Sequence, residues 1–131
     1  MEKPSKNNNS FLKKRILSFK YAFTGIFVSV KSQCNLKIHI IAAIIAIILG
    51  FILKISNQEW LIISIVIGGV ITAEMFNTTI EAIVDIISPE YSENAKKAKD
   101  ISAGAVLILA IVAVVVGIII FVPKIILVIN Q

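Results

Sequence analysis

The chain has 131 residues, of which 57% are hydrophobic and 16% charged, with a formal net charge of +5. So high an apolar fraction excludes a small soluble domain, which could not bury it, and favours a single-domain membrane protein. One cysteine and one histidine exclude an internal disulfide and argue against a zinc site. The basic residues have no interleaved aromatic platform, so they indicate membrane topology and argue against nucleic-acid binding.

The first thirty residues divide into a polar segment and an amphipathic helix. Residues 1–10 contain Pro4 and three consecutive asparagines, and we expect them to be disordered. Over residues 11–31, apolar side chains recur at alternating spacings of four and three, which predicts a helix with one apolar face. This stripe consists of Leu12, Ile16, Phe19, Phe23, Ile26 and Val30. Because the opposite face is basic, the pattern favours a helix lying on an anionic membrane surface.

Three longer apolar runs predict transmembrane helices at residues 38–55, 60–87 and 101–122. The first, about 18 residues long, is close to the lower limit of ~17–25 residues for crossing a bilayer. Residues 88–99 are interpreted as a short polar loop, and Pro123 with Lys124 is expected to end the third span. No cleavable signal peptide is expected, since the first apolar run starts only after Lys37.

The distribution of lysine and arginine predicts the orientation of these spans. Eight such residues precede the first span and three lie in the loop at 88–99, against Lys54 and Lys124 on the other side. Because cytoplasmic loops carry the excess of basic residues, the N-terminus and the loop are predicted to be cytoplasmic. After three spans, the C-terminus is then outside.

Polar residues interrupt the second span on one side only. On a helix of about 100° per residue, Glu74, Asn77, Glu81 and Asp85 share a face ~80° wide. Counted at 1.5 Å per residue from Trp60, which suits the outer aromatic belt, Glu74 lies about 21 Å and Glu81 about 32 Å deeper. In a hydrocarbon core of ~30 Å, Glu74 is just inside the inner boundary and Glu81 is at the headgroups. Ionisable groups in a membrane helix are costly, so they mark a functional site.

Residues 74–85 read E-x-x-N-T-x-I-E-x-x-x-D, and residues 98–106 read A-K-D-x-x-A-G-A-V. In this order, between two spans, the motifs resemble those of the prokaryotic diacylglycerol kinase and undecaprenol kinase family of small membrane enzymes. The resemblance implies ATP- and Mg²⁺-dependent phosphorylation of a lipid by a homotrimer whose active sites are shared between subunits. The resemblance also implies that the protein lacks a soluble kinase fold. Consistent with that, the chain has neither a G-x-x-x-x-G-K-[ST] loop nor a protein-kinase signature.

The resemblance also implies roles for individual residues. Glu74 matches the proton acceptor, Asn77 an asparagine near the reacting centre, and Glu81 the glutamate that binds the metal bridging ATP. The other residues expected to contact ATP are Tyr21, Gln33, Glu90, Tyr91, Lys99 and Asp100. The depths agree with these roles, because a lipid alcohol needs a base at lipid depth and ATP needs a carboxylate and a lysine nearer water.

One position departs from the family pattern. Where the family often has E-R-N-x-R-I-H, this chain has Q-C-N-L-K-I-H, so Gln33 replaces an acidic residue of the metal site. A hard cation prefers charged oxygen ligands, and Gln33 offers only a neutral amide oxygen. Three outcomes stay open: an active kinase with Mg²⁺ held mainly by Glu81 and ATP, a slow enzyme, or an inactive paralogue. We favour the first, and we expect the neighbouring His39 to be structural.

We therefore expect an all-α protein of the bacterial cell membrane, with one amphipathic surface helix and three transmembrane helices, forming a homotrimer. The predicted reaction is phosphorylation of undecaprenol by ATP, with diacylglycerol as the alternative substrate, a choice that rests on analogy with Gram-positive members. A non-catalytic membrane scaffold is the alternative that Gln33 favours. A channel or transporter is disfavoured because the polar residues are confined to one end. Asp85 is given no chemical role and could pair with a lysine.

Overall fold

Four α-helices make up the computed structural model, which describes residues 8–130. They are α1 (Asn8–Ser32), α2 (Cys34–Ile52), α3 (Asn57–Ile87) and α4 (Glu93–Ile129), and no strand occurs between residues 8 and 130. By length and composition, α2, α3 and α4 could each cross a membrane. The predicted all-α membrane architecture, an N-terminal helix followed by three spans, is therefore confirmed.

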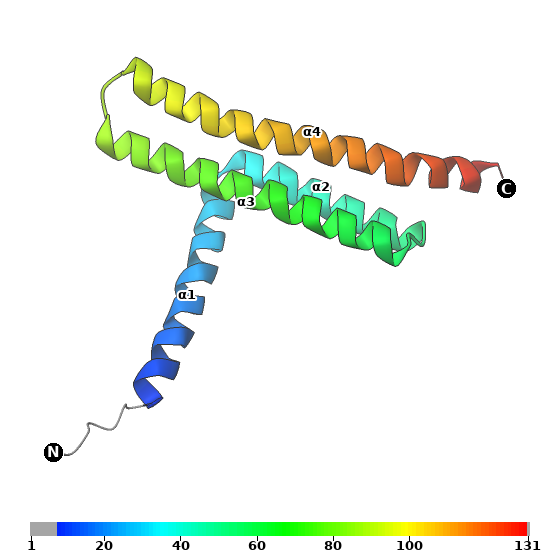
Figure 1. Cartoon of the computed structure of the whole chain (residues 1–131), viewed down its shortest axis with the longest axis horizontal. Coiled ribbons are helices and arrows are strands. Elements are labelled where there is room, and N and C mark those ends of the chain that lie inside the picture. The colour runs from blue at the N-terminus through cyan, green and yellow to red at the C-terminus, as the bar shows by residue number, and fades with distance from the viewer. Residues whose placement is uncertain (1–7, 131) are drawn as a thin grey trace.

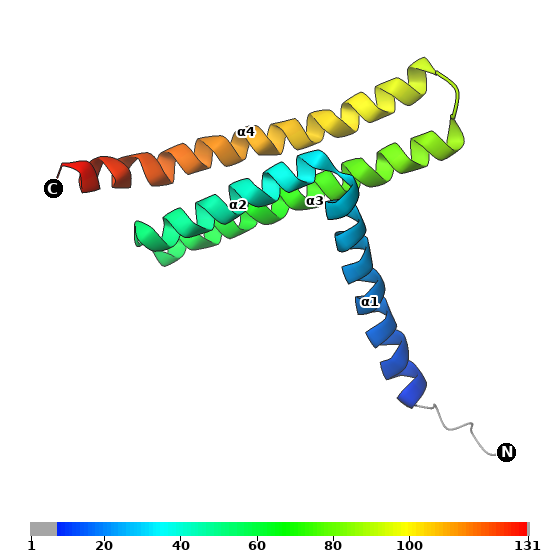
Figure 2. The ribbon, with the colours of Figure 1, turned by 180° about the vertical axis from the view of Figure 1, so that it is seen from behind.

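The three long helices run alongside one another and form the body of the molecule (Figure 1). Helices α3 and α4 make an antiparallel pair joined at one end by residues 88–92. The shorter α2 lies beside the part of α3 farther from that loop, as the view from behind also shows (Figure 2). The last turns of α3 therefore extend beyond α2 and have α4 as their neighbour.

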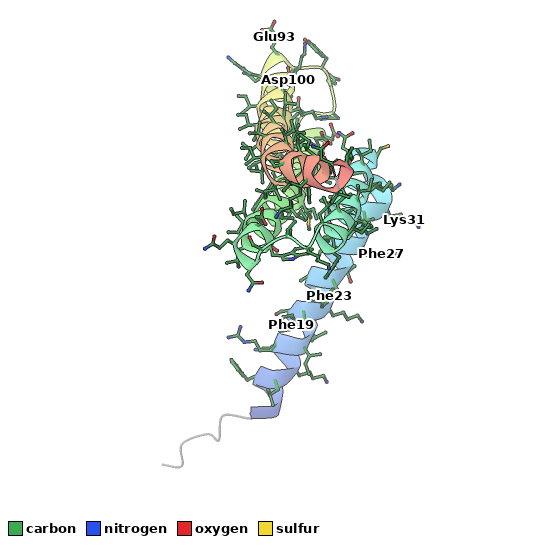
Figure 3. The ribbon with its side chains drawn as sticks, turned by 90° about the vertical axis from the view of Figure 1, so that its right-hand side faces the viewer. Phe19, Phe23, Phe27, Lys31, Glu93 and Asp100 are labelled. Atoms are coloured by element: carbon green, nitrogen blue, oxygen red, sulfur yellow. The ribbon has the colours of Figure 1, made fainter. Side chains whose placement is uncertain are left out.

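Helix α1 leaves the bundle at a steep angle (Figures 1 and 3). The change of direction occurs at Gln33, the one non-helical residue between α1 and α2, with φ −102° and ψ 122°. All side chains from residue 11 to residue 28 are exposed, including Phe19, Phe23 and Phe27, which recur every fourth residue along α1 (Figure 3). None of the helices α2, α3 and α4 covers the apolar side chains of α1 from residue 11 to residue 28, and α1 runs across the direction of these three long helices. Both features suit a helix that lies on a membrane surface.

The turn between α2 and α3 closes the end of the bundle opposite the α3–α4 loop. The Ser56 hydroxyl accepts a hydrogen bond from the Glu59 backbone N–H, and the Glu59 carboxylate accepts one from the Ser56 N–H. This reciprocal capping satisfies two backbone donors that the first turn of α3 leaves without partners. Glu59 also forms an ion pair with Lys124 of α4 at 3.1 Å, which ties the start of α3 to α4.

The apolar core lies at the same end of the bundle. Its buried members are Ile55, Ile63, Ile120 and Phe121. Trp60 packs on Phe51, with ring centroids 4.9 Å apart, and its ring also covers Gly50. A Cβ built on Gly50 would lie 2.7 Å from Trp60 Cη2, so the tryptophan can take this place only because residue 50 has no side chain.

Helix α4 is longer at both ends than the sequence predicted. It begins at Glu93, so most of the predicted loop at 88–99 forms its first turns, and it continues through Pro123 to Ile129. Pro123 therefore does not end the helix. A proline removes one backbone hydrogen bond, but a transmembrane helix tolerates it, and the apolar run that follows favours continuation.

The other boundaries shift by a few residues. Helix α2 begins at Cys34 and ends at Ile52, earlier than the predicted span at 38–55, and α3 begins at Asn57 rather than at residue 60. The capping box at Ser56 accounts for the earlier start of α3. The predicted disorder is wrong for residues 8–10, which are helical, and residues 1–7 lie outside the described part of the chain.

Candidate active site

The polar face predicted for α3 is buried inside the bundle. Glu74 is 3% exposed and Asn77 is 7% exposed. Glu81, one turn farther along α3, is half-buried. The helical repeat thus carries three polar groups on one face from the buried middle of α3 toward the α3–α4 loop.

A continuous chain of hydrogen bonds joins α4 to this face. The Ser102 hydroxyl donates to Asn77 Oδ1 at 2.6 Å, and Asn77 Nδ2 donates to Glu81 Oε1 at 2.9 Å. Ser102 is itself only 7% exposed. Within residues 11–130, whose side chains the structure describes, no buried side-chain nitrogen or oxygen lacks a hydrogen-bond partner. Buried polar groups bonded in this way keep one geometry, because breaking a bond would leave a group unsatisfied away from water.

Glu74 contacts α2 through His39. The distance between His39 Nε2 and Glu74 Oε1 is 3.4 Å, which is within reach of an ion pair. Both residues, together with Asn77, line a cavity of about 220 Å³ between α2, α3 and α4. A buried carboxylate in the wall of a cavity can meet a ligand hydroxyl there, which is the placement that a general base requires.

A second cavity, of about 240 Å³, adjoins the first and is apolar. His39 and Ala110 line both cavities. Apart from His39, the lining of the second cavity consists of alanine, valine and isoleucine side chains from α2, α3 and α4. The Glu74 cavity therefore borders a space suited to a hydrocarbon chain.

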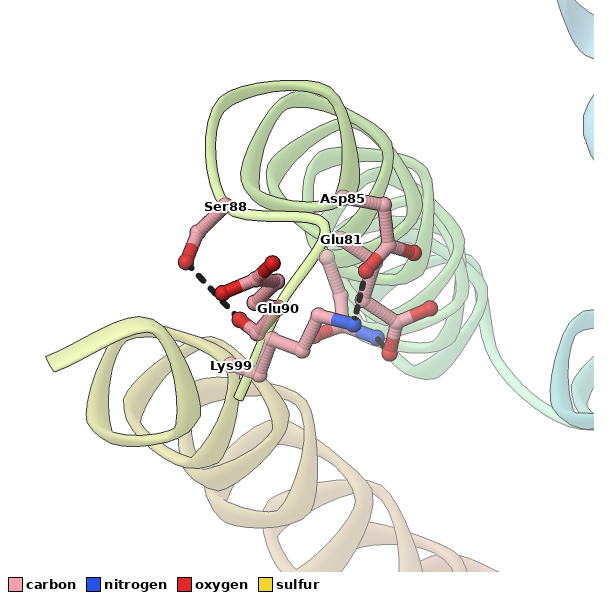
Figure 4. A network of polar contacts seen from close by, with 6 residues as sticks. Glu81, Asp85, Ser88, Glu90 and Lys99 are labelled. Atoms are coloured by element: carbon pink, nitrogen blue, oxygen red, sulfur yellow. Dashed lines mark hydrogen bonds and ion pairs between the residues drawn. The ribbon is translucent and has the colours of Figure 1, made fainter. Parts of the chain in front are cut away.

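The α3–α4 loop forms a third cavity, of about 310 Å³, with a polar lining. Its lining includes four of the residues predicted to contact ATP: Glu90, Tyr91, Lys99 and Asp100. Lys99 reaches from α4 to form an ion pair with Asp85, on the side of α3 that also carries Glu81 (Figure 4). The Ser88 hydroxyl donates to the carbonyl of Glu90 at 3.1 Å and so shapes the loop (Figure 4). The lysine pairing considered for Asp85 is thus present.

Two residues predicted for the site are absent from the lining of these cavities. Tyr21 is 69% exposed on α1 and lines none of the three cavities. Gln33 is half-buried at the α1–α2 junction and lines none of them either. One copy of the chain therefore assembles the α3 face and the loop cavity, while neither Tyr21 nor Gln33 lines any of the three cavities.

Ser102 was not singled out from the sequence, although it belongs to the site. A polar residue near the start of an apolar span was a signal, but serine often bonds only to its own helix. The Ser102 hydroxyl does lie 2.8 Å from the carbonyl oxygen of Lys99. Only the packing of α4 on α3 shows that it also faces Asn77.

The acidic residues suit a cation that arrives with a nucleotide. No group of three or more His, Cys, Asp or Glu side chains that could hold a metal occurs among residues 8–130. Mg²⁺ bound with a nucleotide needs only one or two protein carboxylates, since phosphates and water supply its other ligands. Glu81, half-buried on the way to the loop cavity, fits that requirement.

Comparison with known proteins agrees with the motifs. The family model described as "Prokaryotic diacylglycerol kinase" matches residues 20–121. The chain is 38% identical over 120 residues to an undecaprenol kinase of Bacillus subtilis, covering 92% of this chain and 98% of that one. It is 35% identical over 103 residues to a diacylglycerol kinase of Synechocystis, which covers 78% of this chain and 59% of that one. It is 30% identical over 109 residues to a diacylglycerol kinase of Escherichia coli, which covers 83% of this chain and 89% of that one. The matched segment contains every residue predicted for the site.

Proposed function

Because this chain belongs to the prokaryotic diacylglycerol kinase family, a family of lipid kinases, we propose that it transfers the γ-phosphoryl group of ATP to the hydroxyl group of undecaprenol. Undecaprenol is preferred because the relative named undecaprenol kinase aligns over 98% of its length at 38% identity. The diacylglycerol kinases align at 35% and 30% identity. Diacylglycerol is the alternative substrate within the same reaction class.

The observation that supports this proposal most is the position of Glu74. Its carboxylate is 3% exposed, lines a cavity, and stands beside a second cavity that is apolar. A hydrocarbon chain in the apolar cavity would present a terminal hydroxyl group toward Glu74. Burial of a carboxylate is costly in a purely structural role, whereas a base for a lipid alcohol has to lie at this depth.

In the proposed reaction, the lipid hydroxyl oxygen attacks the γ-phosphorus of ATP while Glu74 accepts the hydroxyl proton. The new oxygen–phosphorus bond forms as the bond from the γ-phosphorus to the β–γ bridging oxygen breaks, and ADP leaves. Asn77, on the same face of α3, lies next to the reacting groups and orients them. A positioned base typically contributes about 10²–10⁴-fold to the rate.

The nucleotide side of the reaction is assigned to the loop cavity. Glu81 would hold Mg²⁺, with Gln33 as a neutral amide ligand, and bound Mg²⁺ neutralises phosphate charge. Lys99 supplies an ammonium group to the phosphates, and Asp100 contacts the nucleotide from the next position of α4. Glu90, Tyr91 and Tyr21 complete the predicted set of residues that contact ATP.

We assign the active site to the cytoplasmic side of the cell membrane and the working form to a homotrimer. The orientation rests on the eight lysine and arginine residues before the first span and the three in the first turns of α4, against two on the other side. A neighbouring subunit could supply Tyr21 and Gln33, which lie apart from the loop cavity of their own chain. The family resemblance supports this shared arrangement.

The proposal is tested by measuring phosphate transfer from labelled ATP in detergent–lipid micelles, with undecaprenol and diacylglycerol offered separately. We expect transfer to undecaprenol that is lost in Glu74→Gln. Transfer only to diacylglycerol would reverse the choice of substrate. No transfer to either lipid, with activity gained in Gln33→Glu, would identify an enzyme disabled at its metal site. No transfer and no ATP binding in any variant would favour a membrane scaffold.

A further inference from the structure

Ser102 is a buried polar residue to which the proposed reaction gives no task. It lies on α4 three residues after Lys99, is 7% exposed, and donates the 2.6 Å hydrogen bond to Asn77 Oδ1. Asn77 in turn donates to Glu81 at 2.9 Å. One hydroxyl group from α4 is thus connected, through Asn77, to the carboxylate proposed to bind the metal.

The hydrogen bond to Glu81 fixes the direction of the bonds in this chain. The amide nitrogen of Asn77 donates to Glu81 Oε1, so the nitrogen faces Glu81. The amide oxygen of Asn77 then faces Ser102, and the Ser102 hydroxyl has to be the donor. Turning the Asn77 amide over would place two acceptors against each other at Glu81, so the amide has one orientation.

The single proton of Ser102 has two acceptors within reach. Asn77 Oδ1 lies 2.6 Å from Ser102 Oγ, and the carbonyl oxygen of Lys99 lies 2.8 Å from it. The Lys99 carbonyl also accepts the backbone bond of its helix turn, because a regular helix pairs residues i and i+4. Loss of the Ser102 hydroxyl therefore costs Asn77 more than Lys99, because Asn77 Oδ1 would be left buried without a hydrogen-bond donor.

We propose that Ser102 is a positioning residue, whose hydroxyl holds the Asn77 amide so that its nitrogen keeps the Glu81 carboxylate in place for the nucleotide. This inference rests on the proposed function and extends it to a residue outside the polar face of α3 and outside the loop cavity. Ser102 acts through Asn77 and does not touch the reacting atoms. Its removal should therefore affect the use of Mg²⁺-ATP more than the binding of the lipid.

Ser64 provides a matched control for this inference. Its hydroxyl bonds to the carbonyl of Trp60 at 2.8 Å, within its own helix and at the other end of the bundle. In Ser102→Ala we expect kcat/KM for Mg²⁺-ATP to fall about tenfold, as for a buried acceptor left without its donor, with KM for the lipid changed less than twofold. Ser64→Ala should match the wild type, and Ser102→Thr, which keeps the hydroxyl, should recover most of the loss.

A second measurement does not depend on activity. In nucleotide-free protein labelled with ¹⁵N-asparagine, the side-chain amide of Asn77 is identified as the signal missing from Asn77→Ala. We expect this signal to shift and its hydrogens to exchange faster in Ser102→Ala, because the amide has lost the bond that fixes it. In Ser64→Ala the signal should stay unchanged.

The two measurements separate failure of this inference from failure of the proposed function. If the wild type phosphorylates neither lipid, the proposed function fails, and the Asn77 amide signal alone decides the role of Ser102. An unchanged amide signal in Ser102→Ala would overturn the inference. A kinetic loss as large in Ser102→Thr or Ser64→Ala as in Ser102→Ala would overturn it as well.

Discussion

The imidazole of His39 on α2 lies 3.4 Å from the carboxylate of Glu74 on α3, and this contact lies where the Glu74 cavity and the apolar cavity meet. The His39 side chain is 23% exposed, whereas Glu74 is 3% exposed. Nε2 of the imidazole faces the carboxylate at this distance, so a ring N–H there could support the Glu74 carboxylate. His39, expected from the sequence to be structural, therefore contacts the proposed base.

We predict that His39→Phe lowers kcat about tenfold, because the ring is kept while the N–H donor next to Glu74 is lost. In His39→Gln, the glutamine amide nitrogen can reach about as far as the imidazole Nε2, so kcat should stay within about threefold of the wild-type value. Steady-state rates with undecaprenol at saturating Mg²⁺-ATP measure both variants, and thermal unfolding checks that each is folded. Full kcat in His39→Phe would leave His39 with the structural role alone.

A second prediction concerns the ion pair between Asp85 and Lys99. The side chains are 66% and 36% exposed, so the pair is largely open to solvent and contributes under about 1 kcal/mol to stability. Asp85→Asn should change the melting temperature little and KM for Mg²⁺-ATP by less than about threefold. Lys99→Met should abolish phosphate transfer, since Lys99 is assigned to the phosphates. Equal losses in the two variants would make Asp85 part of the nucleotide site.

The sequence was sufficient for the membrane architecture and for the polar face of α3. Both depend on local patterns: apolar runs long enough to cross a bilayer, and polar side chains repeated at the helical period. Glu74 and Asn77 were placed on one face from spacing alone, and both are buried. The C-terminal end of α4 could not be predicted in this way, because Pro123 is tolerated within a transmembrane helix.

The contacts between helices could not be predicted either. His39 meets Glu74 across 35 positions of sequence, and Ser102 meets Asn77 across 25. Which side chains face each other depends on how α2 and α4 are rotated against α3, and no local pattern fixes that rotation. The same reason explains why a serine that also bonds to its own helix gave no clear signal.

A third prediction concerns the close approach of Gly50 and Trp60. A Cβ at position 50 would lie 2.7 and 2.9 Å from two atoms of the Trp60 ring and 3.0 Å from Ile55, so Gly50→Ala forces the ring to move. We expect a loss of about 1–3 kcal/mol in stability, as for overpacking in a core. Thermal unfolding in detergent measures it. Gly25→Ala is the control, because nothing lies within 4 Å of its added Cβ; an equal loss there would point to backbone effects.

The last prediction concerns the metal and Gln33. Removal of Mg²⁺ with EDTA should abolish transfer, and added Mg²⁺ should restore it, since the phosphates need a cation for charge neutralisation. Gln33→Glu adds a charged oxygen ligand and should lower the Mg²⁺ concentration at half-maximal rate about tenfold, whereas Glu81→Gln should raise it or abolish activity. Gln58→Glu, a matched change at the opposite end of the bundle, controls for added negative charge. If Gln33→Glu and Gln58→Glu leave the Mg²⁺ dependence equally unchanged, Gln33 lies outside the metal site, and Glu81 with the phosphates is sufficient to hold the cation.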